Sequence, residues 1–503
     1  MTTTESLQKQ LAEAIQWHQA GQPQTAIGIY QALLKQFPGH PHILHLYGLA
    51  RQEQGDWQGA LTLISQAAAR VPDNVDFQLA LGNILKEMGQ NRAALERFRE
   101  VQRRHPGNAE AHFCLADTCM DRGEIEAALP AFQEAIRLRP DFQEAWVNLG
   151  LCLKSRGALE EALHCFRQGI ALRPDNREAH INLGLTLLLM GHYRPGWQAY
   201  EWRLHGPGEA ACVRLPQQLR QPQAPPRWDG SSLAGKRILI LAEQGFGDTI
   251  QFVRYLPLLQ AAGARILLTA PYSLIPLLAR MPAIEYIATV ETFAFPEAID
   301  CSCPLLSLPL LLDTRPDTIP AAIPYLQADP HLVAAWRTRL QSERQVSIGL
   351  VWQGKPLHAN DPLRRRSCQL SDLAPLAGLH GVRWVSLQKR PEGEPPPQPP
   401  PGMALLDLNE ALLDFAQTAA ILANLDLLIS IDTSVAHLAG ALGRPVWLLL
   451  PVAPDWRWTL DQPHTPWYPG MRLFRQTEPH DWQTPVQQVA RALPAFMHNK
   501  TPV

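Results

Sequence analysis

The second half of the chain is dominated by one stretch, Asp426–Pro451, which reads DLLISIDTSVAHLAGALGRPVWLLLP. Leu427–Ile431 and Val446–Leu450 are apolar runs of the length expected for buried parallel strands. A polar turn and a helix over Val435–Leu442 lie between them. In an open parallel sheet, ligands bind beyond the carboxyl ends of the strands, where the free N–H groups of a helix N-terminus attract phosphate. The stretch therefore predicts a phosphate-binding loop in an α/β domain.

Four side chains would line this loop: Asp432, Thr433 and Ser434 in the turn, and His437 one turn into the helix. A second interpretation is a capped helix that follows a buried strand, with His437 packed in the core. Spacing alone slightly favours this second interpretation.

The first half of the chain repeats every 34 residues. The period is shared by Pro38, Pro72, Pro106, Pro140 and Pro174, and by Gly21, Gly55, Gly89, Gly123, Gly157 and Gly191. We expect two short helices per unit, with small residues at the glycine and alanine positions that let helices approach closely and a proline that ends the second helix. This register resembles the tetratricopeptide repeat. It gives five full units over Leu7–Asn176 and a partial sixth over Arg177–Leu204.

Stacked units of this kind form a concave groove. The groove is expected to bind a protein or peptide, and the alternative is a rigid spacer or an oligomerisation arm.

Strand and helix patterns alternate after residue 235, which indicates a parallel α/β architecture. The strand Lys236–Glu243 precedes a glycine turn, and Asp248–Ala262 is predicted to be one helix. A second cycle begins with the strand Val346–Trp352. Near the end, Pro485–Leu493 is predicted to be a closing helix that crosses back to the first α/β domain, with Thr484 as its N-cap.

The stretch DTSVAHLAGALGRP resembles the donor-site motif of the bacterial heptosyltransferases, D-T-G-x-x-H-L-A-x-A-L-G-x-P. In that family the loop and the histidine hold the pyrophosphate of a nucleotide sugar, so the resemblance implies that Asp432, Thr433, Ser434 and His437 bind the donor. Ser434 replaces the family's glycine and would be strained if the backbone there needed glycine. Pro454–Trp458 occupies the place of the family's G-P-T-D-P, but the registers agree only loosely and no role is carried over.

The likeness covers about residues 236–490 and is nearest to the bacterial proteins that fuse such a domain to tetratricopeptide repeats. The layout is also similar to that of the eukaryotic O-GlcNAc transferase. It implies a repeat solenoid followed by a GT-B fold of two Rossmann-like domains. The predicted parts are repeats over 1–204, a proline-rich linker over 205–235, an acceptor-side domain over 236–340 and a nucleotide-sugar-binding domain over 341–503.

Composition excludes several classes of protein. The 503 residues include 45 basic and 47 acidic ones, and a net charge of −2 does not favour a nucleic-acid partner. No apolar run approaches the roughly 20 residues that span a bilayer, and the polar N-terminus does not read as a secretory signal. The eight cysteines are dispersed without metal-ligand spacing. A cytoplasmic protein with reduced, buried thiols and no bound metal is expected.

Asp248 is the candidate catalytic residue. It follows the turn Gln244, Gly245 and Gly247 at a helix start, where the heptosyltransferases carry G-D and the aspartate is the proposed general base. An inverting transfer needs one carboxylate to accept the proton of the acceptor hydroxyl, and the glycines keep the backbone thin for donor and acceptor. The alternative is that Asp248 only caps the helix.

Cations would hold the donor diphosphate, because no D-x-D pair for a bridging metal is present. By resemblance, Lys355 in W-Q-G-K and Arg366 are the expected ligands. Arginine triplets such as Arg364–Arg366 are more often a solvated loop. Gln388, at the end of the strand Val382–Gln388, would face the nucleoside.

The sequence thus predicts an inverting, metal-independent glycosyltransferase that uses a nucleotide sugar and needs no cofactor. Its acceptor would be recruited by the repeats, with a protein or peptide preferred over a glycan or a lipopolysaccharide-type acceptor. The alternative is a non-catalytic repeat scaffold with a degenerate nucleotide-binding GT-B module.

Overall fold

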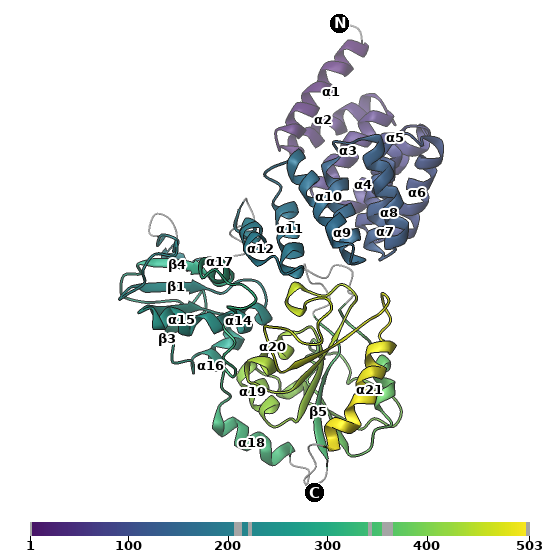
Figure 1. The fold of residues 1–503 in the computed structure, drawn as a ribbon. Helices are drawn as coiled ribbons and strands as arrows, with labels where there is room; N and C mark the ends of the chain where they lie inside the picture. Colours follow the sequence, from purple (N-terminus) through teal and green to yellow (C-terminus); the bar gives the residue numbers. More distant parts are fainter. Residues whose placement is uncertain (1–2, 206–213, 220–223, 341–344, 355–365, 499–503) are drawn as a thin grey trace. The chain divides into compact units, whose positions relative to one another are not determined.

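Figure 1 shows the fold of the chain, a computed structural model. It describes residues 3–205, 214–219, 224–340, 345–354 and 366–498. The chain divides into two compact units, Met1–Leu153 with Ala171–Pro174, and Lys154–Ile170 with Asp175–Val503.

Consecutive helix pairs build the N-terminal region. The helices are α1 (Thr3–Gln19), α2 (Pro23–Gln36), α3 (Pro41–Glu53), α4 (Trp57–Arg70), α5 (Val75–Glu87), α6 (Asn91–Arg104), α7 (Ala109–Asp121), α8 (Ile125–Leu138), α9 (Gln143–Ser155), α10 (Leu159–Leu172), α11 (Arg177–Leu189) and α12 (Tyr193–Tyr200). The short helix η1 (Glu201–Leu204) follows α12. Each of the five evenly spaced prolines lies just beyond the end of a second helix, as predicted.

The evenly spaced glycines have a different role from the predicted one. Gly21, Gly55, Gly89, Gly123, Gly157 and Gly191 all have φ between 71° and 83°. A Cβ at any of them would meet no atom within 4 Å, so they do not permit close helix packing. They end the first helix of each unit in the left-handed conformation that glycine adopts at little cost. Close approach depends instead on glycines within the first helices, such as Gly82, where a Cβ would lie 2.4 Å from Phe98.

The first parallel sheet of the second unit has the strand order β3-β2-β1-β4. Its strands are β1 (Arg237–Leu241), β2 (Arg265–Thr269), β3 (Ile284–Ala288) and β4 (Cys301–Pro304). They alternate with α14 (Phe246–Phe252), η3 (Val253–Tyr255), α15 (Leu256–Ala261), η4 (Tyr272–Leu274), α16 (Ile275–Leu278), η5 (Leu305–Ser307) and α17 (Leu308–Leu311). We call this the first lobe. The helix predicted over Asp248–Ala262 is broken at η3, because Pro257 in the first turn of α15 has no N–H to continue the ladder.

The second sheet has the order β10-β9-β8-β5-β6-β7, again all parallel. Its strands are β5 (Val346–Val351), β6 (Val382–Ser386), β7 (Leu405–Asp407), β8 (Leu427–Ile431), β9 (Val446–Leu450) and β10 (Met471–Arg475). The helices are α18 (Pro330–Leu340), η6 (Leu370–Leu376), η7 (Asn409–Ala411), α19 (Phe415–Ala423), α20 (Ser434–Ala441), η8 (Trp456–Trp458) and α21 (Gln483–His498). We call this the second lobe.

Both sheets follow doubly wound topology. Renumbered from its own first strand, the second lobe runs 6-5-4-1-2-3, the full Rossmann order, and the first lobe runs 3-2-1-4, the first four strands of that order. The strand order reverses between β5 and β8 in one sheet and between β1 and β4 in the other. In such sheets the ligand site lies beyond the carboxyl ends of the strands at this reversal.

Helices cover both faces of the second sheet. Alternate residues of β8 face opposite cores: Leu428 packs with α19 and α20, while Leu427 and Ile429 pack with η6 and α21. Figure 1 shows α19 and α20 on one side of the sheet and α21 on the other. The prediction that the last helix crosses back to the first lobe is therefore wrong, because α21 buries Val486, Val489 and Leu493 in the second lobe. Thr484 lies inside α21, and its N–H bonds to Asp481 instead.

Candidate functional site

Two loops from different sheets meet in the second unit. The turn after β1 leads into α14, and the turn after β8 leads into α20. A Cβ on Gly247 would lie 2.8 Å from Cδ2 of His437 and 3.6 Å from Cα of Ser434. The two loops are thus in direct contact, and glycine is the residue that permits this approach. Each loop lies at the strand-order reversal of its own sheet.

Asp248 lies in the first turn of α14, three residues after the N-cap position of Gly245. Its Oδ2 accepts the Gly245 N–H at 2.9 Å, which is the bond that the capping alternative requires. Its Oδ1 forms an ion pair with Arg457 of the second lobe. The carboxylate therefore caps its helix and also faces the opposite lobe.

Gln244 has a left-handed backbone conformation, with φ of 61°. This conformation is costly for a residue with a side chain and needs support from its surroundings. The support comes from α12, because Gln244 Nε2 donates to Oη of Tyr200 at 2.6 Å. Tyr200 is 5% exposed. The last repeat helix therefore anchors the turn that carries Asp248.

A buried ion network joins η1 to the same turn. The Arg203 guanidinium donates to both carboxylate oxygens of Glu243, at 2.9 and 3.0 Å, and to Ser307 Oγ at 2.9 Å. The side chains of Arg203 and Glu243 are 2% and 0% exposed. Glu243 also accepts the backbone N–H of Leu306 at 3.1 Å. The network fixes the end of β1 to the end of the repeats.

The loop after β8 is well ordered by local bonds. Thr433 is the extended N-cap of α20, and its hydroxyl lies 3.1 Å from Ser430 Oγ. Ser434 begins the helix and is not among the described residues with positive φ. The glycine of the heptosyltransferase motif is therefore not needed here for its backbone freedom, and serine is accommodated without strain.

His437 is 5% exposed and lies at the centre of this contact. Its Nδ1 is 3.0 Å from Tyr468 Oη, and its Nε2 is 3.6 Å from Oδ1 of Asp432. The Trp458 ring packs on the imidazole, with 5.1 Å between centroids. The histidine is therefore packed, as the second interpretation expects, and its Nε2 lies within ion-pair distance of Asp432 in the loop.

The charge of Asp432 is stabilised by its surroundings. Burial by itself would raise the pKa of the carboxyl group, but the hydrogen bonding and charge of His437, with contributions from Trp458 and Arg366, lower the pKa to about 2. An ionised carboxylate therefore stands beside His437 at all ordinary pH values.

Asp432→Asn should change the acid unfolding of the second unit. Because the folded-state pKa lies below the unfolded value of about 3.9, the carboxylate stabilises the fold fully above about pH 4, and this contribution of about 2 kcal/mol is lost as the pH falls towards 2. Tryptophan fluorescence during acid titration should show a shallower decline in the variant. Asp317→Asn, at an exposed position, is the control. Identical acid curves for wild type and Asp432→Asn would contradict the pairing.

Of the two cations predicted to bind the diphosphate, the structure describes Arg366. Arg366 packs its guanidinium on Gly354, where a Cβ would lie 3.0 Å from Nε, and its charge acts on Asp432. Lys355 lies outside the described residues. Gln388 is 7% exposed. Its side-chain Oε1 accepts the Gln353 N–H at 2.9 Å, and its Nε2 donates to the Gln353 carbonyl at 3.1 Å. Its side chain thus fixes the loop after β5.

Sequence reasoning gave no role at this site to Arg457, Tyr468 and Tyr200. Arg457 is 7% exposed, bonds Asp455 at 2.9 Å as well as Asp248, and lies over the Trp456 ring at 4.4 Å. The segment follows β9, whose carboxyl end adjoins that of β8. Loops after neighbouring parallel strands meet at one edge, and this rule could have placed Arg457 at the site without a motif.

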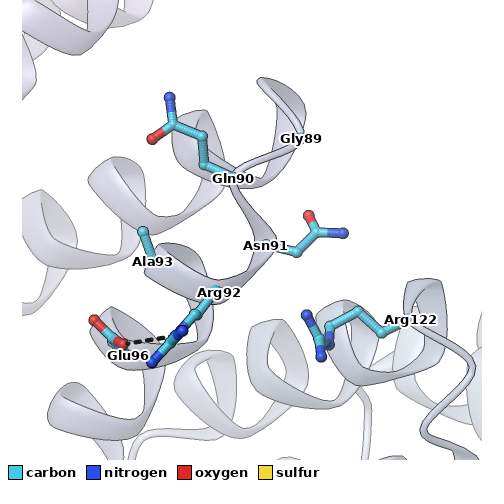
Figure 2. Close-up of a pocket in the computed structure, with 7 residues that line it drawn as sticks. All are labelled: Gly89, Gln90, Asn91, Arg92, Ala93, Glu96 and Arg122. Atoms are coloured by element: carbon cyan, nitrogen blue, oxygen red, sulfur yellow. Dashed lines mark ion pairs between the residues drawn. The ribbon is translucent and has the colours of Figure 1, made fainter.

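Polar side chains also connect the first helices of successive repeats in the first unit. Lys86 on α5 pairs with Asp117 on α7, and Asn148 on α9 donates to Asp117 at 3.0 Å. Figure 2 shows a separate open depression on the repeats, lined by Gly89, Gln90, Asn91, Arg92, Ala93, Glu96 and Arg122. Its Arg92–Glu96 pair is 91% and 66% exposed, so this depression is a solvated surface.

Comparison with known families confirms the repeats. Tetratricopeptide repeat models match residues 18–84, 79–140 and 144–176. Repeats of this family are protein-interaction modules. No helix among the described residues is both long enough and apolar enough to span a bilayer.

A curated relative resembles more of the chain than the repeats alone. Protein FlbA of Caulobacter vibrioides is 30% identical over 353 residues, which are 62% of this chain and 54% of FlbA. The chain thus spans about half the length of this relative, and the matched share is larger than residues 1–204, so the likeness extends into the α/β part.

Solved repeat proteins align with part of the chain. They include MamA (25% identity, 31% of this chain and 92% of that chain, TM-score 0.29), MamA from Desulfovibrio magneticus (20%, 34% and 96%, 0.31) and a thermophilic repeat protein of Thermus thermophilus (21%, 36% and 99%, 0.32).

Proposed function

We propose that this protein is a glycosyltransferase of the GT-B type, which moves a sugar from a nucleotide sugar to an acceptor with inversion and without a metal. The repeats recruit the acceptor, with a protein or peptide preferred. The observation that carries the proposal is the meeting of the Asp248 turn with the His437 loop, each at the strand-order reversal of its own parallel sheet.

The residues at this contact suit the two halves of the reaction. Asp248, from the first lobe, is the group that accepts the acceptor proton. Asp432, Thr433, Ser434 and His437 at the start of α20, with Arg366 and Lys355, receive the diphosphate as it leaves. Because Gly247 touches His437 directly, the proposal requires the two lobes to part when the donor enters.

One observation favours a second candidate function. Asp248 is paired with Arg457 and hydrogen-bonded to Gly245, so the contact is complete without a ligand. A non-catalytic scaffold, in which the α/β part is a degenerate nucleotide-binding module, would keep this closed contact permanently.

Calorimetric titration with nucleoside diphosphates carrying each of the common bases tests the proposal, followed by assay of nucleotide-sugar hydrolysis. One nucleotide should bind, and His437→Ala should weaken it by about tenfold to a hundredfold, the effect of losing a hydrogen bond to a charged group. His464→Ala is the control, because His464 bonds Met471 O elsewhere in the second lobe. Binding without hydrolysis or transfer would favour the scaffold, and no binding at all would overturn both interpretations of the α/β part.

A further inference from the structure

A chain of hydrogen-bonded side chains runs from His437 to the first lobe. Nδ1 of His437 is 3.0 Å from Tyr468 Oη, which is 3.3 Å from Tyr325 Oη. Tyr325 donates its proton to the carbonyl of Ile250 at 3.0 Å and accepts from Arg254 at 3.1 Å. Tyr468 and Arg254 are 1% and 3% exposed. The chain thus links the loop after β8 to the segment that follows α14.

Each tyrosine hydroxyl has one proton, and this decides which group donates and which accepts in each hydrogen bond of the chain. Tyr325 has one proton and gives it to Ile250 O, so only its oxygen remains to face Tyr468. Tyr468 must therefore donate to Tyr325, which leaves its own oxygen to accept from His437. In the opposite arrangement, with Tyr468 donating to His437, two oxygen lone pairs would face each other at 3.3 Å.

Tyr468 and Arg254 both favour this order of donors and acceptors. Burial raises the pKa of Tyr468 well above its ordinary value, so the hydroxyl keeps its proton. Arg254 is held by the carbonyls of Gln251 and Trp467, at 2.9 and 2.7 Å, and its guanidinium lies over the Tyr325 ring. An arginine only donates, so it fixes the Tyr325 oxygen as an acceptor.

The opposite nitrogen of His437 faces the candidate site. Nε2 is 3.6 Å from Oδ1 of Asp432, and a Cβ on Gly247 would lie 3.5 Å from it. The groups packed against the imidazole are Asp432 and Ser434 on its own loop, the neutral rings of Tyr468 and Trp458, and Gly247 of the first lobe. Asp432 is therefore the one charged group among these neighbours, and its carboxylate attracts a proton to Nε2, so the hydrogen bonds on the Nδ1 side must outweigh this attraction in the neutral ring.

We propose that Tyr468, Tyr325 and Arg254 form a positioning relay, which fixes a proton on Nδ1 of His437 and leaves Nε2 to deliver a proton to the departing diphosphate. The second half of this statement rests on the proposed function, whereas the first half stands on the hydrogen bonds alone.

The proton transfer completes the reaction. The acceptor oxygen forms its bond to the anomeric carbon as its proton passes to Asp248. The bond from that carbon to the phosphate oxygen breaks, and the electron pair stays on the oxygen. This oxygen takes the proton from Nε2 of His437, so the histidine ends neutral with its Nδ1 proton in place.

Nitrogen NMR of the full-length protein, labelled at histidine, tests the relay without any substrate. The His437 signals are assigned by their loss in His437→Gln. In the wild type at alkaline pH, the neutral ring should carry its proton on Nδ1. Tyr468→Phe and Tyr325→Phe should each raise the share of the Nε2–H form. Tyr255→Phe is the matched control, because it removes a buried hydroxyl that contacts Thr314 and not this chain. An Nε2–H ring in the wild type would overturn the relay.

Kinetics with the nucleotide sugar that binds test the proton delivery. Tyr468→Phe should lower kcat by about tenfold or more while donor affinity stays unchanged, and Tyr255→Phe should alter neither. An unchanged kcat in Tyr468→Phe, with the predicted tautomer seen in the wild type, would overturn the proton delivery alone. A protein that binds no nucleotide would overturn the proposed function and the delivery together, and the NMR result would still decide the relay.

Discussion

Asp248→Asn should abolish sugar transfer while nucleotide binding survives. Asparagine keeps an oxygen that can accept the Gly245 N–H, so the start of α14 stays in place. It cannot take a proton from the acceptor, and loss of a general base costs about 10²–10⁴-fold in rate. The measurement is release of nucleoside diphosphate from the donor at saturating concentration, beside calorimetric affinity for the same nucleotide.

The control for this variant is Asp372→Asn. Asp372 occupies the corresponding position at the start of η6 and accepts the Gln369 N–H at 2.7 Å. It reports what loss of a capping carboxylate alone does. If turnover in Asp248→Asn equals that of Asp372→Asn, Asp248 is a capping residue and the enzymatic account loses its base.

Arg203→Met should strongly destabilise the second unit. The substitution leaves the fully buried Glu243 carboxylate without its cation, and such a loss costs about 3–5 kcal/mol. Urea unfolding followed by tryptophan fluorescence measures this, because most of the tryptophans lie beyond Lys154. The same variant should also loosen the turn from Glu243 to Asp248 and so lower any transfer rate.

A double variant separates charge from packing. Arg203→Met with Glu243→Gln removes the two buried charges and keeps an oxygen for the Leu306 N–H, while the third member of the network, Glu201, is 24% exposed to solvent, so much of the lost stability should return. Arg265→Met, which breaks the exposed pair with Glu285, should unfold at the wild-type urea concentration. If Arg203→Met also unfolds there, the network does not hold the last repeat helices to the first lobe.

The sequence predicted the elements whose signals are local. Strands such as Leu427–Ile431 were identified because an apolar run of that length, bounded by turn residues, has one good interpretation. The repeats were identified because many positions share one period. The role of the periodic glycines was misread because spacing does not distinguish a left-handed helix end from a close helix contact, and only the φ angles separate the two.

Motifs named Asp248 and His437 as candidates, although they lie far apart in the chain. The contacts that surround them come from tertiary structure and could not be predicted from a motif. Arg457, Tyr468 and Tyr200 carry no local signal, since each matters only through a partner on another element. The ion pair between Arg457 and Asp248 also could not be predicted from the position of Asp248 at a helix start.

The most direct test of the central claim is a co-crystal structure with the nucleoside diphosphate that binds best in titration. The account predicts that the phosphates lie at the N-terminus of α20, within hydrogen-bond reach of Nε2 of His437, and that Gly247 has moved away from the imidazole. A nucleotide bound elsewhere, with the contact between Gly247 and His437 still closed, would contradict it.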